Sequence, residues 1–252
     1  MSVSFDLTGR TAMVTGANTG LGQAIAVGLA RAGADIIAVG RSVPMETAAM
    51  VAETGRALHA IPADLSSVAP LADVVAEAVT AVGAIDILVN NAGIIRRNDS
   101  LDFTEEDWDA VIDTNLKSAF FLSQAVARTW AGAGRGGKII NICSMLSFQG
   151  GIRVPSYTAS KSGLAGLTRL LACEWAARGI NVNAIAPGYF STNNTEALRA
   201  DETRNRDILA RIPAGRWGDP SDISGAAVFL ASDAAAYVHG TVLAVDGGWL
   251  AR

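Results

Sequence analysis

The sequence predicts an α/β fold, in which a single, doubly wound, mostly parallel sheet of about seven strands has helices on both faces. Short apolar runs rich in Ile, Val and Ala alternate with longer segments of helical period along the chain. The first apolar run leads directly into a glycine-rich turn and a helix. No linker, repeat or low-complexity segment divides the 252 residues, so we expect one domain over residues 1–252.

The first predicted strand, residues 10–15, ends in a glycine-rich turn, and a helical pattern then runs to Gly33. Glycines let a backbone turn sharply and approach a pyrophosphate, while a helix N-terminus presents free N–H groups to it. The alternative is a plain strand-to-helix turn, because the spacing Gly-x3-Gly-x-Gly is not the more familiar Gly-x-Gly-x2-Gly. The candidate cofactor-binding residues of this turn are Gly16, Asn18, Thr19, Gly20, Leu21 and Gly22.

The second predicted strand, residues 35–39, ends in Gly40 and Arg41. A dinucleotide-binding fold would place an acidic residue here, about 20 residues past the glycine turn, to bind the adenosine ribose. A guanidinium in place of a carboxylate suits a 2′-phosphate better than a bare hydroxyl. The alternative is that Arg41 is an exposed loop residue without this role.

Two further predicted strands, residues 57–64 and 85–90, also end in polar residues. Asp64 and Leu65 are candidates to border an adenine, with the carboxylate accepting a bond from its amino group. After the next strand, side-chain amides could stabilise the sheet and frame a cofactor. The candidates there are Asn91, Ala92 and Gly93.

Residues 105–130 have the pattern of one long helix with Asn115 in its middle. Because Asn competes for backbone hydrogen bonds, it has poor helix propensity. An Asn inside this helix is either functional or marks a kink.

The remaining segments continue the alternation of strands and helices. A strand at 138–142 brings Ser144 to its carboxyl end, where open α/β sheets carry their chemistry. A strand at 180–186 ends in Pro187 and Gly188. The polar segment near 190–214 is a candidate substrate lid, and the last helix and strand begin near residues 221 and 241.

Tyr157 and Lys161 lie four residues apart, which puts both side chains on one face of a helix that Pro155 opens. An ammonium group near a phenol favours the phenolate, so we expect Lys161 to lower the pKa of Tyr157 from about 10. The positive end of the helix acts in the same direction. The pair therefore predicts a general acid/base that exchanges a proton with an alcohol or a carbonyl.

Composition excludes several classes of protein. A net charge of −4 and the lack of long basic clusters argue against a nucleic-acid partner. No apolar run reaches the roughly 18 residues of a membrane span, and the first residues do not resemble a signal peptide, so we expect a cytoplasmic protein. Two cysteines are expected to be reduced, and neither His59 nor His239 has neighbours at metal-ligand spacing, so no metal site is predicted.

The ordered motifs resemble the short-chain dehydrogenase/reductase family over essentially the whole chain. They are Thr15-Gly16-x3-Gly20-x-Gly22, Asn90-Asn91-Ala92-Gly93, Asn115, Ser144, Tyr157-x3-Lys161 and Pro187-Gly188. The resemblance implies a Rossmann-type fold in which Tyr157 donates or removes the proton and Ser144 holds the carbonyl oxygen. It further implies that Lys161 binds the nicotinamide ribose and that Asn115 anchors a water linking Lys161 to solvent. Pro187, Gly188 and Thr192 are then further cofactor candidates.

The stretches 144–157, 186–189, 192–195, 211–218 and 246–252 closely resemble the branch of this family that acts on deoxy sugar acids in uronate breakdown. The substrate would be an acid such as 2-deoxy-D-gluconate or 2-dehydro-3-deoxy-D-gluconate. Bidentate arginines are natural partners for its carboxylate. The substrate-binding candidates are Arg96, Arg97, Gln149, Arg153, Asn194 and Trp249.

The cofactor is expected to be NAD or NADP, since the branch favours NAD and Arg41 favours NADP. The alternatives for activity are a gluconate or other polyol dehydrogenase, a 3-oxoacyl reductase, or, in another class, a non-catalytic dinucleotide sensor. The family resemblance also implies a homotetramer formed through the long helices and the last strand. Apolar helix residues such as those at 164–167 and 170–171 fit such an interface and a core equally well.

Overall fold

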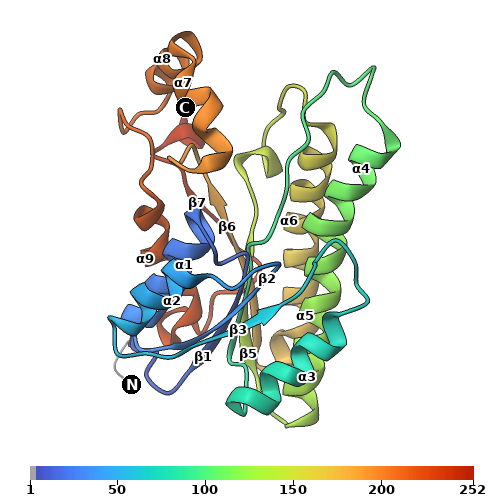
Figure 1. Cartoon of the computed structure of the whole chain (residues 1–252), viewed down its shortest axis with the longest axis vertical. Helices are drawn as coiled ribbons and strands as arrows, with labels where there is room; N and C mark the ends of the chain where they lie inside the picture. The colour runs from blue at the N-terminus through green and yellow to red at the C-terminus, as the bar shows by residue number, and fades with distance from the viewer. Residues whose placement is uncertain (1–3) are drawn as a thin grey trace.

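The computed structural model describes residues 4–252, which form one seven-stranded parallel sheet with the order β3-β2-β1-β4-β5-β6-β7 (Figure 1). The order turns back at β1 and β4, which creates the crevice where sheets of this type bind ligands. The fold class and strand number predicted from the sequence are confirmed. The strands are β1 (Thr11–Thr15), β2 (Asp35–Gly40), β3 (Leu58–Pro62), β4 (Ile87–Asn90), β5 (Gly137–Ile142), β6 (Ile180–Pro187) and β7 (Val242–Val245).

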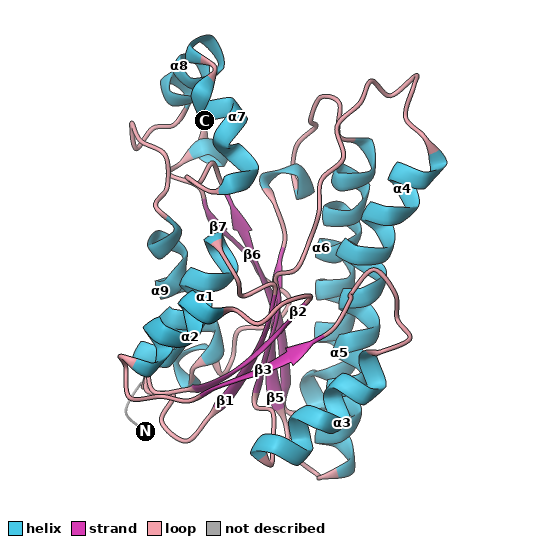
Figure 2. Ribbon diagram, in the orientation of Figure 1, coloured by secondary structure: helices cyan, strands magenta, loops and turns pink. Residues whose placement is uncertain are grey.

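Helices cover both faces of the sheet (Figure 2). Side chains alternate along each strand, so that Ala12 and Val14 pack toward α1, α2 and α9, whereas Met13 packs toward α3, α5 and α6. Because both faces are buried, the strands are apolar almost throughout. The helices are α1 (Gly20–Arg31), α2 (Met45–Ala52), α3 (Leu71–Val82), α4 (Glu105–Ile112), α5 (Ser118–Gly132), α6 (Pro155–Trp175), α7 (Glu196–Ala200), α8 (Glu202–Arg211) and α9 (Ser224–Ala231).

The helix predicted over residues 105–130 is not continuous. A π-helical turn, Asp113–Lys117, separates α4 from α5 and contains the buried Asn115. Asn115 therefore marks a departure from regular α-helical geometry. Several other boundaries differ by a few residues; the strand expected at 57–64, for example, is Leu58–Pro62.

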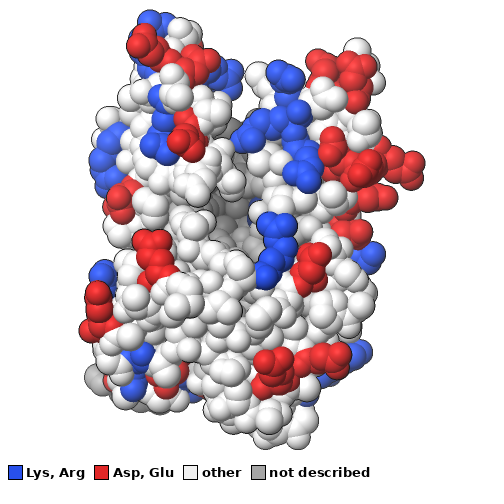
Figure 3. All heavy atoms as spheres, viewed as in Figure 1, with Lys and Arg blue, Asp and Glu red and all other residues white. Residues whose placement is uncertain are grey.

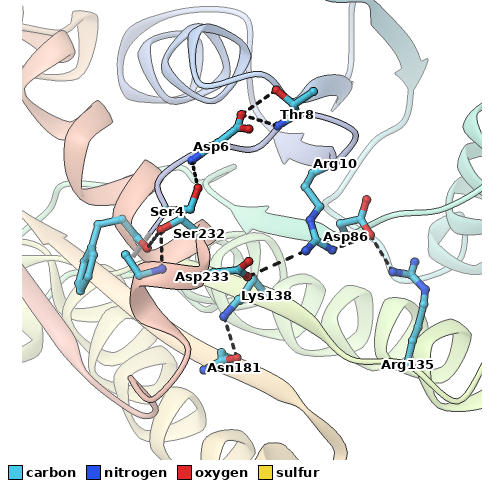
Figure 4. A network of polar contacts seen from close by, with 12 residues as sticks. Ser4, Asp6, Thr8, Arg10, Asp86, Arg135, Lys138, Asn181, Ser232 and Asp233 are labelled. Carbon is cyan, nitrogen blue, oxygen red and sulfur yellow. Dashed lines mark hydrogen bonds and ion pairs between the residues drawn. The ribbon is translucent and has the colours of Figure 1, made fainter. Parts of the chain in front are cut away.

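The amino ends of the strands are tied by a polar network (Figure 4). Asp86 accepts a 2.8 Å bond from Arg135 and another from the backbone N–H of Thr11, and Arg10 lies 3.9 Å from it. Lys138 donates to Asn181 between neighbouring strands. This edge carries structural contacts, whereas the predicted site residues lie at the opposite, carboxyl edge.

The segment after β6 stands above the carboxyl edge of the sheet. It contains a short 3-10 turn at Asn193–Thr195, then α7 and α8, and it returns to pair Phe190 with Gly218. In Figure 3 a hollow separates the part of the surface formed by α7 and α8 from the part formed by α4 and the start of α6. Within residues 4–252 no helix has both the length and the apolar character needed to cross a membrane.

Candidate active site

Ser144, Tyr157 and Lys161 come together where β5 and α6 meet the carboxyl edge of the sheet. Ser144 lies two residues past β5 and caps a short 3-10 turn by accepting a bond from the N–H of Leu146. Pro155 is the first residue of α6, which places Tyr157 in the first helical turn and Lys161 one turn further on. The predicted spacing thus brings the three side chains to one place.

Lys161 is held in a buried position below Tyr157. Its Nζ donates a 2.6 Å hydrogen bond to the carbonyl of Ile142 and lies 5.7 Å from the centre of the Tyr157 ring. Burial disfavours the charged ammonium and lowers the pKa of Lys161 from 10.5 to about 8. The backbone end of β5 therefore fixes the amine close to the phenol.

The expectation that the pKa of Tyr157 is lowered is wrong for the protein alone. Burial of the phenol raises the pKa of Tyr157 above its ordinary value of 10.0, and this outweighs the lowering by a hydrogen bond with Ser144 and by the charge of Arg97. The spacing of Tyr157 and Lys161 predicts the effect of the ammonium group on the phenol but contains no information on the desolvation of the phenol. Without bound ligands, Tyr157 is therefore protonated at neutral pH.

Asn115 reaches from the π-helical turn to the chain after β4. Its side chain accepts from the N–H of Ile94 (2.8 Å) and donates to the carbonyl of Ile94 (2.9 Å) and to Ser160 (3.3 Å). These bonds compensate for the poor helix propensity of Asn. Asn115 thus fixes the 93–94 segment against α6. The water-anchoring role implied by the family stays a prediction.

The glycine turn has the shape of a dinucleotide cradle. Gly16 and Gly20 have positive φ angles of 66° and 58°, which favour glycine. A Cβ on Gly22 would overlap the carbonyl of Gly16 and the side chain of Asn91, so α1 packs against the turn only with glycine at this position. Thr19 precedes α1 without capping it through its side chain, and Leu21 packs on the core. The α1 N–H groups stay available to a phosphate.

Asn91 and Ala92 join this cradle to β4. The side chain of Asn91 donates to the carbonyls of Thr15 (2.9 Å) and Gly16 (3.1 Å), and the N–H of Ala92 donates to the Thr15 hydroxyl (2.9 Å). Gly93 lies against Asn115, whose Oδ1 would be 3.1 Å from a Cβ. The side-chain amide of Asn91, which was predicted to frame a cofactor, thus binds the backbone of the glycine turn.

Arg41 is exposed at the end of β2, next to Ser42. Asn18 donates to the hydroxyl (2.9 Å) and the carbonyl (3.1 Å) of Ser42, which fastens the glycine turn to this corner. The guanidinium, the hydroxyl and the amide form a group that fits a 2′-phosphate. Ser42 was not singled out in the sequence, although its position beside Arg41 was a usable signal.

The other cofactor candidates lie along the same crevice. The Asp64 carboxylate accepts from the N–H of Ser66 (3.0 Å), and this bond lowers the pKa of Asp64, while Leu65 is buried. Gly188, which follows Pro187, packs so closely against Asp246 that a Cβ would lie 2.6 Å from its Cα. The Thr192 methyl group lies over the glycine turn, 3.4 Å from where a Gly20 Cβ would stand.

The three candidate arginines have different surroundings. Arg96 forms a 3.1 Å ion pair with Asp107 of α4. Arg97 donates to the carbonyl of Asn194, 3.4 Å away, in the segment that follows β6. Arg153 is exposed, and its φ of 63° makes it the one non-glycine residue with positive φ within residues 4–252. Figure 3 shows Lys and Arg side chains gathered on this rim of the hollow.

Gln149 and Trp249 are engaged with each other rather than free in the hollow. Trp249 is buried, and its indole N–H donates to Gln149 (3.1 Å). Arg211, at the end of α8, lies 4.0 Å from the Trp249 ring and donates to the same Gln149 oxygen (3.4 Å). Arg211 could not be found from the sequence, because its position above the ring depends on how the C-terminal turn folds back.

The remaining metal-ligating and thiol side chains of residues 4–252 do not form a metal site. In residues 4–252 no three His, Cys, Asp or Glu side chains gather as metal ligands. Burial raises the pKa of the Cys143 thiol, and Cys173 is exposed and free.

The fold and this geometry define a dinucleotide-binding oxidoreductase site, with an acid/base Tyr beside a nicotinamide crevice. A family model described as enoyl-(acyl carrier protein) reductase matches residues 16–250. The chain belongs to the short-chain dehydrogenase/reductase family. It is an NAD(P)-dependent oxidoreductase that acts on a CH–OH group.

The chain is similar to well-described relatives over nearly its whole length. It is 60% identical to the 2-dehydro-3-deoxy-D-gluconate 5-dehydrogenase of Dickeya dadantii, covering 99% of this chain and 98% of that one. It is 44% identical to the gluconate 5-dehydrogenase of Gluconobacter oxydans, over 97% and 96% of the two chains. A crystal structure of a proposed 2-deoxy-D-gluconate 3-dehydrogenase from Agrobacterium tumefaciens, with bound NADP, has 61% identity, a TM-score of 0.92 and coverage of 98% and 99%.

Proposed function

We propose that the chain is a dehydrogenase of deoxy sugar acids that interconverts 2-dehydro-3-deoxy-D-gluconate and its 5-keto form with NADP as the preferred cofactor. The observation that carries the proposal is that Ser144 hydrogen-bonds Tyr157 while the charge of Arg97 acts on the same phenol. Arg153 is exposed two residues before α6 begins. The relatives named above support the same substrate class. This activity belongs to the breakdown of uronates in the cytoplasm.

In the proposed mechanism Tyr157 exchanges a proton with the substrate oxygen, and Ser144 hydrogen-bonds that oxygen. The nicotinamide, when bound, supplies or accepts the hydride. Lys161 hydrogen-bonds the nicotinamide ribose from its place at the end of β5. Asn115 keeps the segment beyond β4 in place, and the acid/base step contributes roughly 10² to 10⁴ in rate.

NADP is favoured by the corner that Arg41, Ser42 and Asn18 form. Within residues 4–252 Arg41 forms no ion pair, and its guanidinium is exposed and accessible to a phosphate. Hydrogen bonds from Ser66 lower the pKa of the nearby Asp64 carboxyl, and the charge of Arg41 adds to this lowering. The rest of the proposed cofactor crevice is lined by the glycine turn and by residues that follow other strands. These are Asp64, Leu65, Asn91, Pro187, Gly188 and Thr192. The bound NADP of the A. tumefaciens relative supports this assignment.

Steady-state rates test the proposal. We expect reduced nicotinamide to form from 2-dehydro-3-deoxy-D-gluconate, with a higher kcat/KM for NADP than for NAD. D-Gluconate belongs in the same panel because of the G. oxydans relative, and short 3-oxoacyl thioesters test the reductase alternative. Greater activity with gluconate or an oxoacyl thioester would replace the proposed substrate. Cofactor binding without any turnover would favour a sensor.

The carboxylate of the substrate is proposed to bind Arg97 and Arg153, with Gln149, Asn194 and Trp249 as weaker contacts. Arg96 is not a good partner, because Asp107 already neutralises it. Arg97→Ala should raise KM for the sugar acid by about tenfold or more, since a charge-assisted hydrogen bond is lost. Arg96→Ala is the matched control from the next position in the chain and should leave KM nearly unchanged. Equal effects in the two variants would remove Arg97 from the site.

We also infer that residues 190–214 act as a lid and that four chains assemble into a homotetramer. Contacts from this segment to both sides of the hollow support the lid: Thr192 lies on Gly20, and Asn194 accepts from Arg97. Exposed apolar residues on the long helices support the assembly.

A further inference from the structure

Arg199 of α7 has a guanidinium group that is only partly satisfied. Its terminal nitrogen donates to the carbonyl of Thr192, 3.2 Å away. Its Nε is buried and has no hydrogen-bond partner among residues 4–252. None of the ion pairs of this described part of the chain involves Arg199. Because buried N–H groups are nearly always paired, this one marks an incomplete site.

Thr192 contacts both Arg199 and the glycine turn. Its carbonyl binds Arg199, and its methyl group lies 3.4 Å from where a Gly20 Cβ would stand. Gly20 is the first residue of α1, whose N–H groups face the position of a cofactor pyrophosphate. Thr192 therefore connects the guanidinium to the helix end at which that position lies.

The glycine turn itself supplies no positive side chain. Residues 16–22 contain neither Lys nor Arg, and the chain as a whole carries a net charge of −4. A pyrophosphate brings two negative charges to this turn, and backbone N–H groups and the helix dipole compensate only part of them. An arginine can donate to two phosphate oxygens at once. Arg199 has the unused donor and the charge that the turn lacks.

We propose that Arg199 binds the pyrophosphate of the cofactor and so couples the lid to cofactor binding. This inference rests on the proposed cofactor crevice. It gives α7 a role in cofactor binding that is separate from the acid/base chemistry of Ser144, Tyr157 and Lys161. The guanidinium exchanges its bond to Thr192 for the phosphate oxygens, or keeps it and adds the free Nε–H. In either case the first part of the lid becomes ordered over the nicotinamide half of the crevice.

Binding measurements with cofactor fragments test this role without turnover. Dissociation constants for NADPH, 2′-phospho-ADP-ribose and 2′-AMP are measured by calorimetry for wild type and Arg199→Gln. We expect the variant to bind NADPH and 2′-phospho-ADP-ribose about tenfold more weakly, as for one lost charge-assisted bond. Binding of 2′-AMP, which has no pyrophosphate, should not change. Arg199→Lys keeps the charge and should recover part of the affinity.

Arg204→Gln is the matched control, because Arg204 is exposed on α8 of the same segment and the substitution changes the net charge equally. It should bind all three ligands like wild type. The proposal fails if Arg199→Gln binds both pyrophosphate ligands normally, if only NADPH is weakened, or if 2′-AMP is weakened equally. Wild-type protein that does not bind NADPH at all would overturn the proposed cofactor crevice together with this inference.

Discussion

Lys161 links the chemistry of the site to the stability of the fold. Its pKa is about 8 in the folded chain against 10.5 ordinarily, because the ammonium group is buried with one backbone carbonyl as partner. Between these two values the unfolded chain binds more protons than the folded chain. Stability should therefore rise with pH in this window, and the full cost of burying the charge is present below pH 8.

Lys161→Met isolates this effect, because the variant keeps a side chain of similar length without the titrating group. The free energy of unfolding of wild type minus that of the variant should be constant below pH 8. It should then increase by up to roughly 1.4 kcal/mol per pH unit toward pH 10.5. Urea denaturation at pH 7, 8, 9 and 10 measures the difference. A difference that stays flat over this range would show that folding does not lower the pKa of the amine, which would then stay charged in the folded chain.

Tyr157 shows what residue spacing predicts and what it does not. The Tyr-x3-Lys spacing correctly placed the two side chains together, since this follows from helix geometry alone. The direction of the Tyr157 pKa depends on how far the phenol is removed from water, which the spacing does not contain. A raised pKa suits the reductive direction, in which Tyr157 donates its proton.

At the scale of elements, the strands were predicted best. Each is an apolar run that ends in a glycine or polar residue, and the two buried faces of a parallel sheet make that pattern strong. The break between α4 and α5 was harder to predict, because its cause is tertiary. Asn115 leaves regular α-helical geometry to bind Ile94, which is 21 positions away in the chain.

The lid segment was predicted as a polar region, but its contacts were not. Arg211 stacks on Trp249, and both donate to Gln149, so three segments far apart in sequence meet at one side-chain oxygen. The same holds for Arg199 and Thr192, whose contact depends on how α7 packs. Sequence patterns identify which residues are polar, whereas these pairings arise only once the chain has folded.

In the whole molecule, structural contacts and the candidate active site lie at opposite edges of the sheet. The amino edge is joined by ion pairs around Asp86, whereas the carboxyl edge carries the glycine turn, Ser144 and Tyr157. Along the outer side, α5 and α6 lie next to each other (Figure 1), and side chains of both line a shallow hollow. The apolar α6 residues at 164–167 and 170–171 were expected in either the core or an interface. Leu164, Ala165 and Leu171 are buried in the core, whereas Leu170 is 48% exposed.

Leu170 and Phe121 therefore mark the helix face that a second copy of the chain would cover. Burying a leucine side chain contributes about 1.5–3 kcal/mol, and a symmetric contact uses each residue twice. Light scattering should give wild type a mass four times that of one chain, and Leu170→Glu should give smaller species because a carboxylate would be buried at the contact. Leu101→Glu is the control, since the same change is made at a loop residue that is 95% exposed. A tetramer that persists in Leu170→Glu would place the interface elsewhere, and a monomeric wild type would refute the assembly.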